Sequence, residues 1–184
     1  NARVPGGRSS GARDDEGAPT RKNSLIEQGR LVGSLWSTRD AAQQIAEGRI
    51  DIATSTGSAI RSGHQSPPVS GCSNLFLTSS QKGRSYEEML EMIEDGYIVN
   101  SVMGAHTANP TSGDFSVTTS SILRVEGGEV IGAVKQAGLS GNLANALKDG
   151  VTLGDEVRPQ GSYSSGSMYL PNVLLRNGLR VNPV

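Results

Sequence analysis

Apolar and polar residues alternate or gather in short runs along most of the chain, a pattern typical of β-strands. Glycine-containing turns at 28–29, 126–128 and 177–178 separate neighbouring runs, so we expect hairpins there. The strands are expected at residues 24–27, 30–36, 75–78, 97–103, 115–125, 129–134, 167–176 and 179–182.

Three short stretches carry helix signals instead. We expect helices over residues 37–48, 85–96 and 140–149, where a serine N-cap or a stopping glycine brackets apolar residues at helical spacing. In the second stretch, Ser85 and Glu88 form the pattern of a capping box. Hairpin-linked strands with about three short helices predict an α+β fold built on a mainly antiparallel, curled or barrel-like sheet.

Composition changes along the chain and suggests where its order begins. Residues 1–20 are almost all Gly, Ser, Pro, Arg and acids, which alone cannot bury enough surface to offset their ordering entropy. We expect a polar arm that is flexible or packed on a missing domain or partner, followed by a single α+β domain over residues 21–184. Residues 54–74 predict a long polar loop. Because Asn1 is not Met, we expect a fragment or a processed product.

Charge and cysteine content narrow the function classes. The chain has 17 Lys+Arg and 18 Asp+Glu, a formal net charge of -1 and a pI near 6.2, so we predict no direct binding to nucleic acid. Its apolar runs are too short for a membrane span and no signal-peptide core stands near the start, so we predict no membrane association. A single cysteine, Cys72, excludes an internal disulfide and favours a cytoplasmic protein.

The sequence gives little support for metal or nucleophilic chemistry. His64 and His106 are the only histidines; neither is followed by Glu, and nearby prolines would break a zinc-binding helix. No phosphate-cradling loop or dinucleotide fingerprint occurs, the serine-rich run 162–167 has no neighbouring histidine, and the lone Cys72 is more often incidental than catalytic. We therefore assign no catalytic residue and no metal ligand in this chain.

Two local clusters remain as candidate sites. Within 13–17, three adjacent carboxylates repel one another and are stable when solvated, paired with cations, or hydrogen-bonded to backbone N–H groups. Within 112–116, an Asp follows a Gly at the start of a strand, where Asp commonly caps a turn. A structural role and a substrate-facing role both stay open for each cluster. The candidates for substrate binding are Asp14, Asp15, Glu16, Asp114, Phe115 and Ser116.

These clusters and several further motifs, in this order, resemble the TldD/PmbA family, a peptidase family formerly called modulators of DNA gyrase. The similarity covers essentially the whole chain and therefore does not depend on any one motif. It is carried by residues 13–20, 25–31, 55–59, 113–116, 127–130, 139–143 and 166–171.

The resemblance implies the C-terminal domain of a metallopeptidase subunit that acts on unfolded or extended peptides in proteolysis or maturation. In the family, a metal-binding helix with two histidines precedes this region, and a cysteine near the C-terminus supplies a further ligand in the TldD branch. Residues 161–166, where that cysteine would fall, contain none, and Cys72 lies too far upstream to match it. This departure favours the PmbA (TldE-like) branch, whose members resemble a non-catalytic partner of the catalytic subunit.

Partner and cofactor expectations follow from the same resemblance. We expect a homodimer or a heterodimer with a TldD-like subunit, zinc in the full-length complex but none in this fragment, and no activity of the fragment alone. A sheet rich in Gly, Ser and Thr lets a peptide backbone approach closely, so we hypothesise that residues 115–123, or the strand after Gly166, border a peptide cavity. Two alternatives stay open: a non-proteolytic modulator of a protein such as DNA gyrase, and a plain dimerisation domain.

Overall fold

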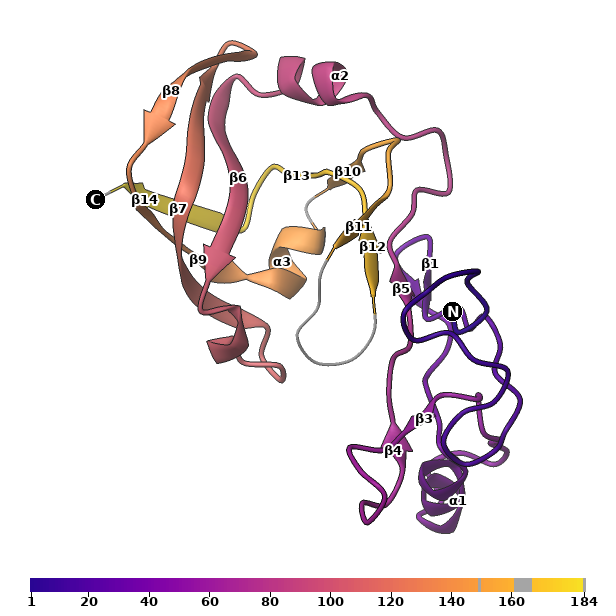
Figure 1. Cartoon of the computed structure of the whole chain (residues 1–184). Helices are drawn as coiled ribbons and strands as arrows, with labels where there is room; N and C mark the ends of the chain where they lie inside the picture. The colour runs from indigo at the N-terminus through magenta and orange to yellow at the C-terminus, as the bar shows by residue number, and fades with distance from the viewer. Residues whose placement is uncertain (149, 161–166, 184) are drawn as a thin grey trace. The chain divides into compact units, whose positions relative to one another are not determined.

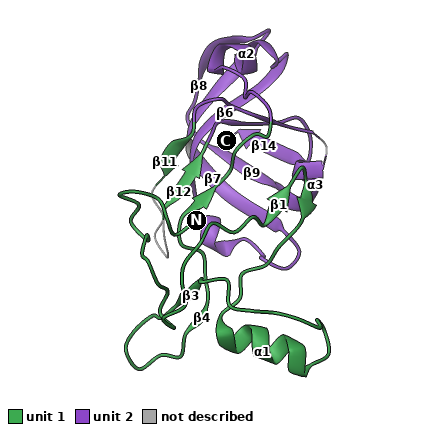
Figure 2. Ribbon diagram, turned by 90° about the vertical axis from the view of Figure 1, so that its right-hand side faces the viewer, with its two compact units in different colours: residues 1–80, 157–170 green, residues 81–156, 171–184 purple. Residues whose placement is uncertain are grey.

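The computed structural model describes residues 1–148, 150–160 and 167–183, and these form a mostly antiparallel β-structure with three short α-helices (Figure 1). They divide into two compact units, residues 1–80 with 157–170 and residues 81–156 with 171–184 (Figure 2). The predicted fold class is confirmed, while the single domain over residues 21–184 stays a prediction. The helices of the described residues are too short or too polar to serve as a membrane span.

Unit 2 is built on a strongly curled, half-barrel sheet in which β7 is the central strand (Figure 1). One edge of β7 pairs with β6, and its other edge pairs with β9 along its first half and with β8 along its second half. β14 pairs with β9 and completes the order β14-β9-β7-β6. The strands are β6 (Asp95–Met103), β7 (Asp114–Glu126), β8 (Glu129–Val134), β9 (Ala137–Asn142) and β14 (Leu179–Pro183), and every pairing is antiparallel.

The core of unit 2 lies against β7 and β9. Alternate residues of β9 are buried because successive strand residues point to opposite faces, and β7 follows the same rule as far as Thr119, where a shift in its register with β6 interrupts the alternation. α2 (Tyr86–Glu91) and α3 (Leu143–Lys148) each add one buried apolar residue, and a short 3-10 turn, η1 (Ala105–Thr107), follows β6. β10 (Val151–Leu153) pairs with β13 (Val173–Leu175) in a separate two-stranded sheet. The buried apolar residues are Met89, Val117, Ile122, Val125, Ala137, Leu139 and Ala146.

Unit 1 contains little regular structure. β5 (Leu75–Phe76) pairs in parallel with β12 (Met168–Leu170), which also pairs with β11 (Arg158–Gln160). The rings of Phe76 and Tyr169 stack across the β5–β12 pair with centroids 4.3 Å apart. The remaining elements are the pair β1 (Ile26–Glu27) and β2 (Arg30–Leu31), helix α1 (Thr38–Ala46), and the pair β3 (Ala59–Ile60) and β4 (Val69–Ser70).

Polar contacts hold residues 1–20 within unit 1. The Arg3 guanidinium donates through Nε to the carbonyl of Thr20 at 2.9 Å, and Asn74 Nδ2 donates to the carbonyl of Asn1 at 2.9 Å. Thr20 and Asn74 are both buried. A segment with few apolar side chains is thus placed by hydrogen bonds rather than by a hydrophobic core of its own.

The local helix signals are confirmed. Ser37 caps α1 and accepts the backbone N–H of Asp40 at 3.0 Å. Ser85 and Glu88 form the predicted capping box at the start of α2. α2 ends at Glu91, earlier than predicted, because β6 already begins at Asp95.

The predicted third helix, residues 140–149, is wrong in its first residues. α3 begins at Leu143 because the preceding residues form β9, which is enclosed between β7 and β14. A glycine suits this crowded place, since a Cβ on Gly141 would collide with the carbonyl oxygen of Gly178. Residue 149 lies outside the described residues, as do residues 161–166.

The C-terminal hairpin predicted at 177–178 is also wrong. The chain bends there, but β13 pairs with β10 while β14 pairs with β9, so the flanking strands are not partners. The strand predicted over 167–176 is divided at Pro171 into β12 and β13. The strand predicted over 30–36 is short, since ladder pairing stops at Leu31.

Gly57 offers a test of how residues 1–20 pack. Its φ is +64°, and a Cβ would collide with the carbonyl oxygen of Pro19. We expect Gly57→Ala to lower the free energy of unfolding by about 1–2 kcal/mol or more, through left-handed strain and displacement of that segment. Urea denaturation measures the change.

The matched control is Gly63→Ala. Gly63 has no atom within 4 Å of a built Cβ and no positive φ, so we expect a change within about 0.5 kcal/mol. Equal stability of both variants would show that the segment does not pack against Gly57.

Candidate functional site

The carboxylate of Asp14 binds backbone N–H groups from two parts of unit 1. One oxygen, Oδ1, accepts the N–H of Glu16 at 3.0 Å and of Ala18 at 2.9 Å, which closes a tight turn. The other, Oδ2, accepts the N–H of Ala59 in β3 at 3.0 Å. Asp14 is half-buried, so its charge is balanced by N–H dipoles rather than by a cation.

The two neighbouring acids make similar contacts in different directions. Asp15 Oδ2 accepts the backbone N–H of Arg61 at 2.7 Å. Glu16 Oε2 accepts the backbone N–H of Thr38 at 2.6 Å, at the N-terminus of α1, where a negative charge is favourable. The cluster therefore ties residues 13–20 to β3 and to α1. Of the states left open by the sequence, hydrogen bonding to backbone N–H groups is the one observed. A role of these acids in substrate binding stays a prediction.

Asp114 is held by side chains at the start of β7. Its Oδ1 accepts Asn142 Nδ2 at 2.8 Å and its Oδ2 accepts Ser112 Oγ at 2.7 Å. Hydrogen bonds from Asn142, and secondly from Ser112, lower the pKa of Asp114 from its ordinary value. The carboxylate is exposed and ionised at neutral pH, and it fixes the turn before β7 against the end of β9.

Successive side chains of β7 point to opposite faces of the sheet, and this separates the three substrate-binding candidates of the second cluster. Asp114 and Ser116 lie on one face of the sheet, and Phe115 lies on the other. On the polar face, Ser116 is paired with Ser140, which is paired with Arg180 of β14. A polar depression of about 510 Å³ lies on this face and includes Asp114, Ser140 and Arg180. The cluster therefore does not form one site, and its role in substrate binding stays a prediction.

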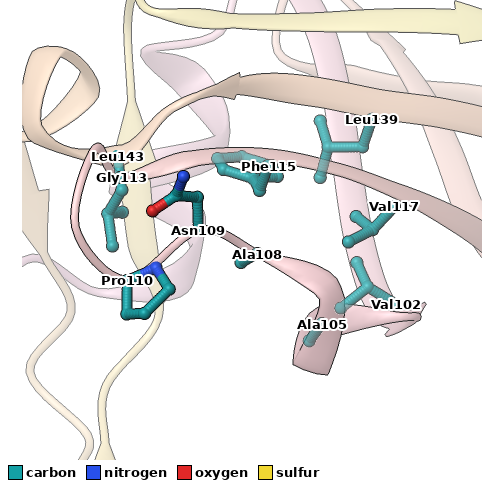
Figure 3. Close-up of a pocket in the computed structure, with 10 residues that line it drawn as sticks. All are labelled: Val102, Ala105, Ala108, Asn109, Pro110, Gly113, Phe115, Val117, Leu139 and Leu143. Carbon is teal, nitrogen blue, oxygen red and sulfur yellow. The ribbon is translucent and has the colours of Figure 1, made fainter.

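Phe115 lines an apolar pocket of about 340 Å³ on the other face (Figure 3). Val117 and Leu139 of the sheet, Leu143 of α3, and the turn with Ala105 and Ala108 form its other walls. From the sequence, Phe115 was a site candidate and Val117 lay within residues 115–123, the strand proposed to border a peptide cavity. A signal for the rest exists, since residues 99–113 and 136–147 contain no Asp, Glu, Lys or Arg.

The metal implied by the resemblance does not fit this chain's described residues. Among residues 1–148, 150–160 and 167–183, no three His, Cys, Asp or Glu side chains come together to hold an ion. The carboxylates of the acidic cluster already accept backbone N–H groups. We therefore derive no metal-dependent step from these residues.

Comparison with known proteins gives a consistent result. A family model described as the PmbA/TldA metallopeptidase C-terminal domain matches residues 1–180. The chain is 27% identical over 160 residues to the metalloprotease PmbA of Escherichia coli O157:H7, covering 87% of this chain and 31% of that protein. It is 26% identical over 146 residues to the metalloprotease TldD homolog of Buchnera aphidicola, covering 79% and 28%.

Solved structures agree with this match. TldE from Thermococcus kodakarensis superposes with a TM-score of 0.76 at 28% identity, covering 94% of this chain and 36% of that one. A Thermotoga maritima protein titled as a modulator of a DNA gyrase superposes with a TM-score of 0.73 at 31% identity, covering 98% and 36%. The chain spans about a third of the length of the relatives it matches.

A substitution of Asp14 tests whether the acidic cluster is structural. Asp14→Ala removes the acceptor for the N–H groups of Ala18 and Ala59, among others. We expect the free energy of unfolding to fall by about 2 kcal/mol or more, because hydrogen bonds to charged groups contribute strongly. Exposed Asp51→Ala is the control, with an expected change within about 0.5 kcal/mol. Urea denaturation compares them, and equal stability would contradict the structural role.

A second prediction concerns the pKa of Asp114. Asn142→Ala removes the main cause of its lowered value, so we expect the pKa of Asp114 to rise toward the ordinary carboxyl range. A carboxyl group whose pKa is lowered in the folded state contributes to stability above its unfolded-state pKa. That contribution is lost as the pH falls through the folded-state pKa. The variant therefore loses this acid-sensitive contribution.

An NMR titration of the carboxyl groups in the full chain measures the pKa of Asp114 directly. Ser140→Ala, on the same face of β9, is the control and is expected to leave that pKa unchanged. An Asn142→Ala variant with an unaltered Asp114 titration would show that this hydrogen bond is not the cause.

Proposed function

The chain belongs to the PmbA/TldD metallopeptidase family as its C-terminal domain, and we propose that it supplies protein surface to the peptidase rather than metal ligands. In this proposal it forms part of a subunit interface and part of the wall of a cavity for unfolded or extended peptides. Zinc would be held elsewhere in the full-length complex. Because the chain spans about a third of its relatives, the activity and partners of the whole protein belong to the proposal.

The observation that carries the interface role is the apolar hairpin formed by β1 and β2. Ile26 and Leu31 are cross-strand partners and are 66% and 77% exposed, and the adjoining Val32 is 53% exposed. A tight turn at Gln28 and Gly29, both with positive φ, joins the strands. A two-stranded hairpin is marginal in water, and neighbouring exposed apolar side chains favour burial against another surface.

The hairpin carries one acidic and one basic side chain, so its charges can complement those of a second copy of the hairpin or of a homologous one. Glu27 stands opposite Arg30, next to the Ile26–Leu31 pair. In a two-fold arrangement the same patch serves both subunits, so Glu27 of one hairpin can face Arg30 of the other. This pattern supports a homodimer, or a heterodimer with a homologous TldD-like subunit.

The cavity role requires a distinction between strand edges and strand faces. β7 is paired along both edges at Thr118 and Ile122, and β12 is paired with β11 and β5. A peptide cannot add as a further strand to an edge that is already paired. Either strand would therefore line a cavity through its faces where both of its edges are paired, and the face of β7 is rich in Ser and Thr.

We also propose the PmbA (TldE-like) branch. Its support is the sequence of residues 161–166, which lacks the cysteine that the resemblance implies for the TldD branch. The structure of TldE superposes well, but relatives named after both branches are similar to this chain. A cytoplasmic location stays a prediction. No feature of the described residues favours the DNA gyrase alternative over the peptidase.

A charge placed on the hairpin tests the proposed interface. We expect Leu31→Glu in the full-length protein to weaken subunit association at least tenfold (about 1.4 kcal/mol), because it buries an unpaired carboxylate. Analytical ultracentrifugation with and without a TldD-like subunit measures association, and hydrolysis of an unfolded peptide should fall in parallel.

Ile52→Glu is the matched control, since Ile52 is 87% exposed and lies outside the hairpin. It should leave association and hydrolysis unchanged. Circular dichroism verifies that both variants fold. Association that is insensitive to Leu31→Glu would refute the hairpin interface.

A further inference from the structure

We propose that the apolar pocket beside Phe115 binds a single uncharged apolar side chain of an extended peptide. This inference rests on the proposed function, which places peptides along unit 2, and it adds a side-chain preference. The pocket has a volume of about 340 Å³, at the lower end of the range of ligand sites. Such a volume accommodates one large aliphatic or aromatic side chain rather than a folded partner.

The walls of the pocket come from separate parts of unit 2 and are fixed by hydrogen bonds. The ring of Phe115 and the side chains of Val117 and Leu139 form the sheet side (Figure 3). The loop after η1 forms the opposite side and is tied to β7 by the N–H of Asn109, which donates to the carbonyl of Asp114 at 2.9 Å. The pocket is thus formed before a ligand arrives, which lowers the entropic cost of binding.

Charge is absent from two of the segments that supply these walls. Residues 99–113 and 136–147 contain no Asp, Glu, Lys or Arg, although 19% of the chain is charged. Depletion of charge with retention of large apolar groups is characteristic of the centre of a binding surface. A charged side chain would find no counter-ion among these residues and would lose its hydration.

The mouth of the pocket is apolar and accessible. Val102 and Leu143 line the pocket and are 41% and 50% exposed, and the adjacent Met103 is 59% exposed. Exposed apolar groups around an apolar cavity favour an apolar occupant.

Asn109 supplies the feature that selects a peptide. Its Oδ1 accepts the backbone N–H of Thr111 at 2.9 Å and of Ser112 at 3.1 Å. This leaves Nδ2, which has no partner among the described residues, on the pocket side (Figure 3). An amide N–H₂ beside an apolar cavity matches a peptide, which carries a carbonyl acceptor next to an apolar side chain.

Peptides that differ at one position test this proposal on the full-length protein. The probes are Ac-Gly-Gly-X-Gly-Gly-NH₂ with X as Leu, Ala or Asp, and calorimetry in the presence of EDTA reads binding without hydrolysis. We expect the Leu peptide to bind at least about tenfold more tightly than the Ala peptide, as burial of added methylene groups requires, and the Asp peptide to bind no better than Ala.

Ala105→Trp should fill the pocket and remove the preference for Leu. His106→Trp adds the same ring to the same turn at an exposed position outside the lining and should keep the preference. Asn109→Ala, which removes the free amide, should weaken all three peptides by a similar factor.

The outcomes separate this inference from the proposed function. Equal affinity for the Leu and Ala peptides would overturn the pocket while leaving a peptide-lining wall intact. A preference for Leu that survives in Ala105→Trp would place the selectivity elsewhere and overturn the assignment to this pocket. Failure of every peptide to bind would refute the peptide-lining role itself, independently of the hairpin interface.

Discussion

Pairing of β7 along both edges is the constraint on which the rest of unit 2 depends. From Thr118 to Glu126 its backbone N–H and C=O groups are used within the sheet, so mainly its two faces remain there for contact with other molecules, whereas Asp114–Val117 pair with β9 alone. Along its first residues, the two-residue period of the strand divides those faces. Asp114 and Ser116 lie on a polar surface with Arg180, while Phe115 and Val117 lie on an apolar one. Residues adjacent in sequence consequently serve different surfaces.

Unit 1 is stabilised in a different way, because it has few apolar side chains to bury. Carboxylates and hydroxyls connect distant segments of this unit by accepting hydrogen bonds from their backbone N–H groups, where a larger domain would use a hydrophobic core. Asp14 reaches Ala59, and Asp40 accepts the N–H of Ser70 at 3.0 Å. Hydrogen bonds from Ser70 and then Ser37 lower the pKa of Asp40, so its charged form is the one that stabilises this arrangement. Acidic residues in such a unit need no catalytic explanation.

Local signals in the sequence predicted what depends on local structure. Ser37 capped its helix and Ser85 with Glu88 formed a capping box, because each involves residues within one turn. The errors arose where the answer depends on distant partners. Nothing near Gly141 indicates that β9 is enclosed by β7 and β14, and the alternation that separates Phe115 from Asp114 required the strand register. The apolar pocket was missed because its walls are about forty residues apart in sequence, although charge depletion marks both.

The difference between strand edges and strand faces also bears on how this domain would meet a peptide under the proposed function. An edge binds any extended backbone with little regard for side chains, whereas a face with a preformed pocket discriminates among side chains at the expense of generality. β7 and β12 offer no such edge along their paired lengths. If peptides meet the apolar face of β7, the contact involves side chains, and the pocket beside Phe115 then selects among them. A family member with a charged residue in the segment equivalent to residues 99–113 would, by the same reasoning, accept a different class of peptide.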